Sequence, residues 1–198
     1  KLIQQEKREG KASAINLFLK KATSPILVLE SGDTIPSKDT IEKLCLPFKD
    51  KKIGMTGARP IPINNKNNFL GYVIHSWWYI HNKLPRFGEL IAFRNVIKKI
   101  SPYTSVDEAY IENLITQKGF KLKQVEDALI YNKGANNIKD LLKQRRRVYV
   151  GHILLKKEFK YSVSSFNFLK IFKLIILYWK QDPKLKHLIW LLGGALLE

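Results

Sequence analysis

A carboxylate that could bind a metal ion or a phosphate follows a short apolar segment. Ile26 to Leu29 are all apolar and predict a buried strand, and the polar residues Glu30 to Asp33 come directly after it. Open α/β sheets bind ligands at the carboxyl ends of their strands. A turn loosened by Gly32 and closed by Pro36 would let Asp33 reach a cation or a phosphate there. A solvated turn remains the alternative interpretation of this segment alone.

A second acidic group lies at the expected start of a helix. The apolar pattern predicts a helix from residue 105 or 107 to residue 118, ended by Gly119. Asp107 and Glu108 would then occupy its first turn. Carboxylates there could act as acid or base, but compensation of the helix dipole explains their position equally well.

A third group is basic and lies on another expected helix. Gln144 and Arg147 are three residues apart and therefore share one face of it. Residues 145–147 are all arginine, a pattern typical of a solvated face or of a patch that binds nucleic acid or lipid.

The elements that would position these groups alternate between strands and helices. We expect strands at 26–29, 53–57, 89–93, 121–124 and 128–131, and helices at 10–22, 40–44, 69–81, 105–118 and from 136 or 137 through 147. Ala14, Leu17 and Phe18 are the expected apolar face of the first helix. Residues 59–68, rich in Pro and Asn, predict a loop. The fold class is therefore α/β.

The tail of the chain has a different character. Residues 166–179 predict an amphipathic helix, with Lys170, Lys173 and Lys180 along one edge, which suits the interface of an anionic bilayer. Residues 187–197 are strongly apolar but shorter than the about 20 residues that span a bilayer. We favour membrane association, while a pair of core helices remains the alternative.

Composition narrows the partners further. The 198 residues suffice for one ordinary domain, and a formal charge of +18 indicates an anionic partner such as nucleic acid, acidic lipid or a phosphorylated substrate. Cys45 is the only cysteine, which excludes an internal disulfide and a thiol metal cluster. The chain opens without methionine and stops inside an apolar run, so we expect a fragment cut from a longer protein.

Four motifs follow one another in a characteristic order. They are residues 8–16 (REGKASAIN), 29–34 (LESGDT), 106–122 (VDEAYIENLITQKGFKL) and 144–148 (QRRRV). Each is weak alone, but together they resemble the family 2 glycosyltransferases of the membrane-bound synthase type. This group contains cellulose, hyaluronan, chitin and poly-N-acetylglucosamine synthases, which serve polysaccharide biosynthesis. The resemblance covers nearly the whole chain.

The resemblance implies a GT-A fold, a Rossmann-like nucleotide-diphospho-sugar transferase sheet with flanking helices. It places the family's first strand or strands before Lys1. Residues 1–155 would form a partial catalytic domain, inactive alone. Residues 156–198 would form an interfacial amphipathic helix and the start of a transmembrane segment.

The resemblance also implies roles for the acidic residues. Asp33 matches the second aspartate of the family's metal motif and would bind Mg²⁺ or Mn²⁺. Glu108 matches the general base, with Asp107 beside it. Hard carboxylate oxygens suit both the cation and the deprotonation of an acceptor hydroxyl.

Further roles concern the donor and the acceptor. Lys11 would lie near the nucleotide sugar, while Gln144 and Arg147 would clamp its diphosphate, a task suited to the planar guanidinium. Gly88 would lie near the acceptor.

Three positions depart from the family pattern. Ser31 replaces the first aspartate of the metal motif, so that the cation would rest on Asp33 and the diphosphate. Glu108 replaces the usual aspartate. Val148 replaces a tryptophan that would support a growing polysaccharide. The replacement at Val148 favours transfer of a single sugar over processive synthesis.

The expected function is metal-assisted, inverting transfer from a nucleotide sugar, at family level a UDP-sugar, to a lipid-linked or saccharide acceptor. The reaction would take place at the cytoplasmic face of a membrane. One alternative is a degenerate, non-catalytic glycosyltransferase-like domain, for which Ser31 argues. Another is a basic nucleic-acid-binding domain, but the sequence lacks zinc-finger spacing, an RNP-like aromatic strand and a clear helix-turn-helix. We therefore expect no nucleic-acid partner.

Overall fold

The computed structural model describes residues 2–84, 87–160 and 168–197. Its strands are β1 (Ile26–Glu30), β2 (Thr34–Pro36), β3 (Ile53–Pro62), β4 (Leu90–Arg94) and β5 (Lys121–Asn132). Its helices are α1 (Lys11–Lys21), α2 (Thr40–Cys45), the 3₁₀ helix η1 (Leu46–Lys49), α3 (Phe69–Lys83), α4 (Asp107–Gln117), α5 (Ile138–Phe159), α6 (Phe168–Trp179) and α7 (Leu185–Ala195). The alternation of elements confirms the predicted α/β class.

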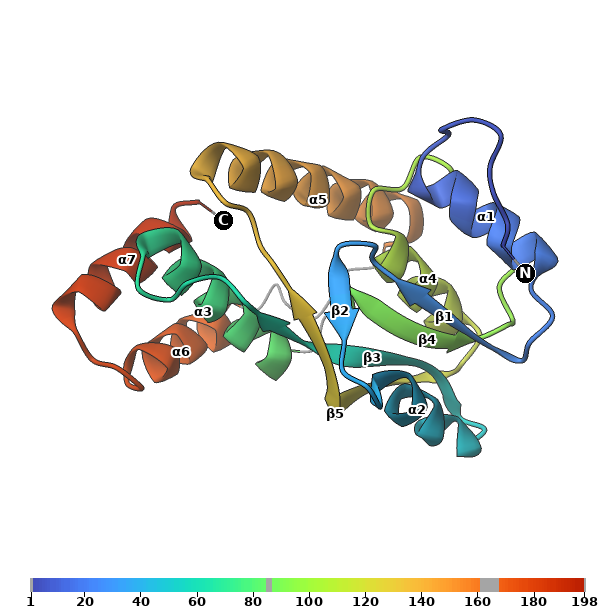
Figure 1. The fold of residues 1–198 in the computed structure, drawn as a ribbon, viewed down its shortest axis with the longest axis horizontal. Coiled ribbons are helices and arrows are strands. Elements are labelled where there is room, and N and C mark those ends of the chain that lie inside the picture. The colour runs from blue at the N-terminus through green and yellow to red at the C-terminus, as the bar shows by residue number, and fades with distance from the viewer. Residues whose placement is uncertain (1, 85–86, 161–167, 198) are drawn as a thin grey trace.

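One mixed sheet organises the described residues (Figure 1). Its strand order is β1-β4-β3-β5-β2. The central pair β3 and β5 is parallel, whereas β4 runs antiparallel to both β1 and β3, and β2 runs antiparallel to β5. As a result, the loop after β1, the start of β4 and the end of β5 lie at the same end of the sheet.

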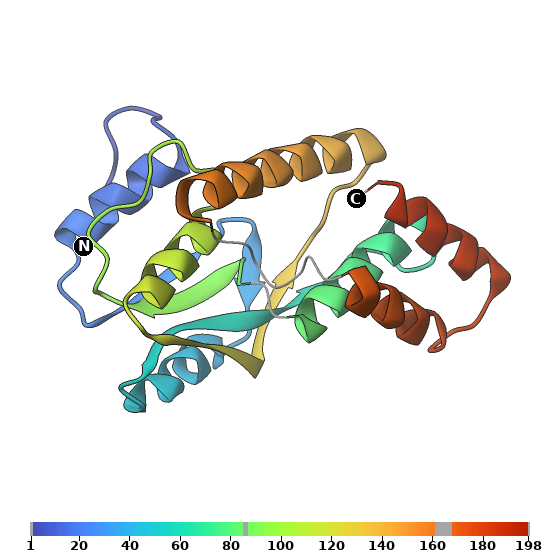
Figure 2. The same ribbon diagram turned by 180° about the vertical axis from the view of Figure 1, so that it is seen from behind.

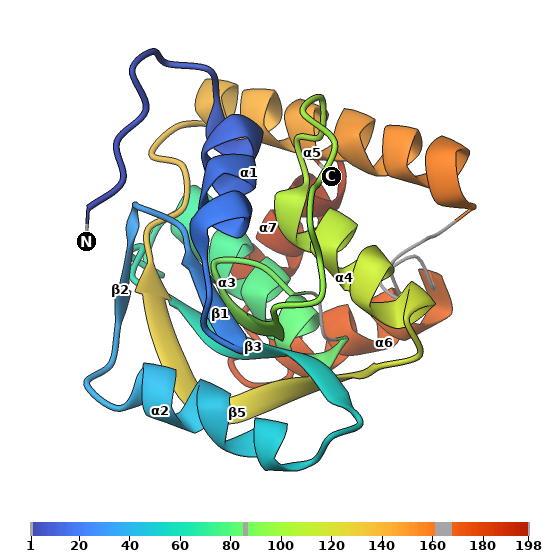
Figure 3. The same cartoon turned by 90° about the vertical axis from the view of Figure 1, so that its right-hand side faces the viewer.

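Helices cover both faces of the sheet. Successive side chains of a strand point to opposite faces, so each strand can bury apolar side chains against helices on both sides. On β4, Ile91 and Phe93 are buried with residues of α1 and α4, while Leu90 and Ala92 are buried with residues of α2. Figure 3 shows α1 and α4 over one face and α2 against the other. This burial holds the strand ends, and the polar residues that follow them, in fixed positions.

Two sequence expectations about strands are wrong. Residues 59–62 are not loop but the end of β3, even though Pro60 and Pro62 lie there. Beyond Gly57, β3 pairs only with β5, so the missing N–H groups of these prolines can face the unpaired side. The expected strands at 121–124 and 128–131 form one strand, β5. Its pairing with β3 shifts register between Ala58 and Arg59 of β3.

The first helix forms where expected, and Phe18 of the expected face packs partly buried against the core, but its fully buried residues are different ones. Ala12, Ile15 and Leu19 are its buried residues, whereas Ala14 is exposed. Helical spacing alone predicted Ala14 on the apolar face, but contact with the sheet sets which side of the helix is buried.

A second cluster of side chains joins α3 to α6 and α7 (Figures 1 and 2). Tyr72 of α3 stacks on His187 with ring centroids 4.2 Å apart, and lies 5.3 Å from the ring of Tyr178. The two C-terminal helices thus pack against α3 through buried aromatic side chains.

The expected C-terminal membrane helices are not supported. In the parts of the chain that the structure describes, no helix combines the length and the apolar character needed to cross a membrane. The expected amphipathic helix forms as α6, although residues 166–167 of the predicted range lie outside the described residues. The domain boundary expected at 155/156 stays a prediction.

Candidate active site

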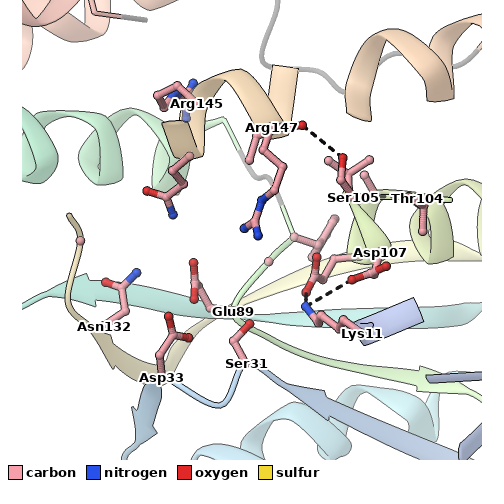
Figure 4. A pocket seen from close by; sticks show the side chains of 18 of the residues that line it. Lys11, Ser31, Asp33, Glu89, Thr104, Ser105, Asp107, Asn132, Arg145 and Arg147 are labelled. Carbon is pink, nitrogen blue, oxygen red and sulfur yellow. Dashed lines mark hydrogen bonds and ion pairs between the residues drawn. The ribbon is translucent and has the colours of Figure 1, made fainter. Parts of the chain in front are cut away.

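A cavity of about 600 Å³ lies between the strand ends, α3 and α5. Every residue that the sequence nominated for a site lines it, and these are Lys11, Asp33, Gly88, Asp107, Glu108, Gln144 and Arg147. Figure 4 shows carboxylates on the sheet side of this cavity and arginines on the α5 side. The roles assigned to these residues remain predictions, but the structure places them around one space.

Backbone hydrogen bonds fix the turn that carries Asp33. The Ser31 N–H donates to the carbonyl of Glu89 at 2.7 Å, which extends the pairing of β1 with β4 by one residue. The Thr34 hydroxyl donates to the Ser31 carbonyl at 2.7 Å and closes the turn. Asp33 is thereby held at the cavity wall.

The acidic pair at the start of α4 is joined to α1 by one lysine. Lys11 Nζ lies 2.6 Å from Glu108 Oε1 and 3.5 Å from Asp107 Oδ2. The side chain of Asp107 is 6% exposed and that of Glu108 17% exposed, so Glu108 is the more accessible of the two from the cavity.

For Lys11 and for Asp107 alike, burial and the charge of the ion-pair partner shift the pKa in opposite directions. Burial lowers the pKa of Lys11, but the pairing with Glu108 and Asp107 more than offsets that effect and raises it above its ordinary value. Burial raises the pKa of Asp107, and the charge of Lys11 opposes the rise. Lys11 is therefore protonated and neutralises part of the negative charge here.

The amide and guanidinium groups on α5 form the opposite wall. Asn137 begins α5 by accepting a hydrogen bond from the backbone N–H of Asp140 at 2.8 Å. Farther along, the Ser105 hydroxyl donates to the Arg147 carbonyl at 3.1 Å, which ties α5 to the start of α4. Gln144 and Arg147 are exposed within the cavity.

Close approach of α5 to α4 depends on Gly151. A Cβ at this position would collide with the Ser105 hydroxyl and with the Val106 side chain. The absence of a side chain therefore sets the distance between Arg147 on α5 and the acidic pair on α4.

Sequence reasoning missed Glu89, which it treated only as the first residue of a strand. Glu89 precedes β4, has a backbone φ of 55° and lines the cavity. Burial raises its pKa to about 7, and the nearby charges of Asp33 and Glu108 add to the rise. A polar residue directly before the apolar run of residues 90–93 was the available signal.

Asn132 was also missed. It ends β5, is 7% exposed and lines the same cavity as Glu89. Its Oδ1 atom is buried and has no hydrogen-bond partner among the described residues. Such an atom is costly to bury unless a ligand completes its coordination.

Aromatic side chains of α3 form the remaining wall. Trp77 and Trp78 both line the cavity, and the guanidinium of Arg145 lies 5.1 Å from the ring centroid of Trp77. Their position at the cavity adds a surface on which a sugar ring could rest.

The oxygen atoms near Asp33 suit a divalent cation that also binds a ligand. The described residues contain no group of three or more His, Cys, Asp and Glu side chains that could hold a metal ion alone. However, Asp33 and Glu89 are carboxylates and Asn132 offers an unpartnered amide oxygen, and hard cations prefer such ligands. These residues fit a cation that takes its remaining ligands from a diphosphate and water.

Comparison with solved structures identifies the class of fold. The chain is similar to the mannosyltransferase PcManGT from Pyrobaculum calidifontis, solved in complex with GDP-Man and Mn²⁺. The TM-score is 0.59 at 16% identity, and the match covers 100% of this chain and 62% of that chain. The likeness shows the α/β fold of a GT-A transferase. The chain thus spans less than two thirds of that protein.

Sequence comparison then identifies the family. Residues 1–104 match the model of glycosyl transferase family 2, and the chain belongs to this family. No curated protein matches the chain in sequence. The expected family and fold are confirmed, whereas the membrane-bound synthase type and the truncation stay predictions.

Proposed function

We propose that this chain provides the catalytic cavity of an inverting, metal-assisted glycosyltransferase that takes a sugar from a nucleotide-sugar donor. The observation that carries the proposal is the convergence of Asp33, Glu108 and Arg147 on one cavity in a family 2 domain. These are the groups that a cation, an acceptor hydroxyl and a diphosphate require.

The donor diphosphate would bind between the two charged walls. Arg147 and Gln144 approach it from α5, where a guanidinium can donate two parallel hydrogen bonds to phosphate oxygens. Lys11 approaches from α1. A cation at Asp33 would neutralise charge on the leaving diphosphate. The roles of these four residues rest on the family resemblance and on their shared cavity.

Glu108 is the proposed general base. Its carboxylate takes the proton of the acceptor hydroxyl while the hydroxyl oxygen forms a bond to the anomeric carbon. The bond from that carbon to the diphosphate oxygen breaks, and the nucleoside diphosphate leaves with the electron pair. Glu108 is preferred over Asp107 because it is the more exposed of the two. Without substrate, Lys11 holds Glu108 in place at 2.6 Å.

UDP is the proposed nucleotide, on the strength of the family resemblance. The structural neighbour's complex with GDP-Man and Mn²⁺ supports a nucleoside-diphosphate sugar and a divalent cation in general. The proposed metal is Mg²⁺ or Mn²⁺. A guanosine-specific enzyme is an outcome that the donor test below distinguishes.

The proposed acceptor is a lipid-linked or short saccharide at the cytoplasmic face of a membrane. The surfaces of α6 and α7 support this placement, because Leu169 is 78% exposed, Phe172 is 55% exposed and Leu192 is 63% exposed. Lys170 and Lys173 on the same helix α6 would favour anionic lipid. Transfer of one sugar is preferred to processive synthesis because Val148 replaces the family's tryptophan.

Donor turnover by the complete protein tests the proposal. The nucleoside diphosphate released from UDP-glucose, UDP-N-acetylglucosamine and GDP-mannose would be measured with Mg²⁺, with Mn²⁺ and with EDTA. We expect release from at least one UDP-sugar that depends on the cation. Release from GDP-mannose alone would overturn the choice of UDP, and release that EDTA leaves unchanged would overturn metal assistance.

A non-catalytic domain is the second candidate, and Ser31 in the metal motif is the observation that favours it. Such a domain would bind UDP but release none from any donor. Binding of an oligonucleotide that weakens steeply with salt, without nucleotide-sugar binding, would instead indicate a nucleic-acid-binding domain.

A further inference from the structure

The carboxylate that Ser31 lacks is present on the neighbouring strand. Ser31 and Glu89 are joined by the 2.7 Å backbone hydrogen bond that extends the β1–β4 pairing. Residues directly opposite each other on paired antiparallel strands have Cβ atoms about 5 Å apart. The sheet therefore places the Glu89 carboxylate next to the position where the family has its first metal-motif aspartate.

A second strand pairing brings an amide oxygen to the same place. Thr34, which follows Asp33, pairs with Asn132 in the antiparallel ladder of β2 and β5. Asn132 and Glu89 line the same cavity. Figure 4 shows the side chains of Asp33, Glu89 and Asn132 grouped on one side of the cavity. The end of β1, the start of β4 and the end of β5 thus each place one oxygen-bearing side chain at this side of the cavity.

We propose that Glu89 supplies the second carboxylate for the divalent cation at Asp33, and that Asn132 supplies a third protein oxygen. This inference rests on the proposed function and names the residues that complete its cation site. It explains how a family 2 domain can keep a cation although Ser31 offers only a hydroxyl.

Three observations favour this role over simple packing. The Asn132 Oδ1 atom is buried without a hydrogen-bond partner in the described residues, as expected of an acceptor that coordinates a bound ligand. Glu89 lines an open cavity instead of the sheet core. Its φ of 55° is unfavourable for a residue with a side chain, and such strain persists at functional sites.

Direct binding of Mn²⁺ tests the proposal without any measurement of turnover. Free Mn²⁺ would be titrated by electron paramagnetic resonance against the complete protein, with and without UDP. The variants are Glu89→Gln, Asp33→Asn and Asn132→Leu. Glu30→Gln is the matched control, because Glu30 is an exposed carboxylate at the end of β1 outside the cavity.

We expect Glu89→Gln to weaken Mn²⁺ binding by at least tenfold, as Asp33→Asn does, and Asn132→Leu to weaken it by a few fold. Glu30→Gln should change it less than twofold. If Glu89→Gln behaves like the control while Asp33→Asn loses Mn²⁺, the inference is wrong and the proposed function stands. If neither variant loses Mn²⁺, both the inference and the proposed cation site are wrong.

A rescue variant separates loss of a ligand from loss of folding. Ser31→Asp restores the family's carboxylate beside position 89. The double variant Ser31→Asp with Glu89→Gln should therefore recover most of the Mn²⁺ affinity that Glu89→Gln loses. Recovery below twofold, in a protein whose melting temperature equals that of the parent, would contradict the exchange of roles between the two positions.

Discussion

Glu89 is a cavity residue whose surroundings strongly change its acidity. Burial, with the charges of Asp33 and Glu108 in addition, raises the pKa of Glu89 from 4.5 to about 7. The folded protein therefore keeps a proton that the unfolded chain releases between these two values. The stabilisation is complete below pH 4.5 and is lost as the pH rises to 7, by about 3 kcal/mol.

The Glu89→Gln variant should reverse this loss, because glutamine stays neutral at every pH. We expect its melting temperature, relative to the parent, to be several degrees higher at pH 8 than at pH 5 when both are measured in EDTA. Glu30→Gln should show no such dependence. An equal difference at both pH values would show that Glu89 is charged in the folded protein throughout.

Residue types and motifs predicted the cavity residues that belong to sequence motifs, but not Glu89. Lys11, Asp33, Glu108 and Arg147 stand in sequence motifs and all line the cavity. Glu89 belongs to no motif, and its position beside Ser31 arises from strand pairing across more than fifty residues. Periodicity shows which side chains share a face, but not which strands become neighbours.

At the scale of elements, the approach of α5 to α4 sets the width of the cavity. Gly151 permits this approach, because a side chain there would collide with Ser105 and Val106. The hydrogen bond from Ser105 to the Arg147 carbonyl lies at the same contact. A larger residue must therefore displace the helix that carries Gln144 and Arg147.

The Gly151→Leu variant should lower affinity for UDP by about tenfold or more and should also lower the melting temperature. Val150→Leu is the control, since Val150 is 46% exposed on the same helix. Isothermal titration with UDP measures the first effect and a thermal melt the second. Unchanged UDP affinity in Gly151→Leu would show that α5 does not contribute to the nucleotide site.

Element types followed from the sequence more reliably than their extents or faces. The start of α5 directly after Asn137 is set by a capping side chain, and the end of α4 before Gly119 is set by a glycine with φ of 81°. The extension of β3 through Pro60 and Pro62 depends on which of its edges lacks a partner, and the buried face of α1 depends on the sheet beneath it. Both require tertiary structure.

At the scale of the whole molecule, a sheet domain adjoins a cluster of three helices. Packing of α6 and α7 on α3 uses buried aromatic residues, yet large apolar side chains remain exposed on the outer surface of the two helices. Together with a formal charge of +18, this surface suits the headgroup region of an anionic bilayer.

Vesicle binding tests this placement. The double variant Leu169→Ser with Phe172→Ser should bind vesicles containing phosphatidylglycerol at least tenfold more weakly than the parent in a sedimentation assay. Leu46→Ser is the control, because Leu46 is 49% exposed and begins the 3₁₀ helix η1, directly after α2. Equal binding by the parent and the double variant would exclude α6 as the membrane contact.

The central claim is that Glu108 deprotonates the acceptor in a sugar transfer at this cavity. Its most direct test is the rate of UDP release by Glu108→Gln in the complete protein, with UDP affinity measured in parallel and Glu126→Gln, an exposed carboxylate on β5, as control. We predict that Glu108→Gln lowers turnover by about a thousandfold or more while UDP affinity stays within threefold of the parent. Normal turnover by Glu108→Gln would contradict the account.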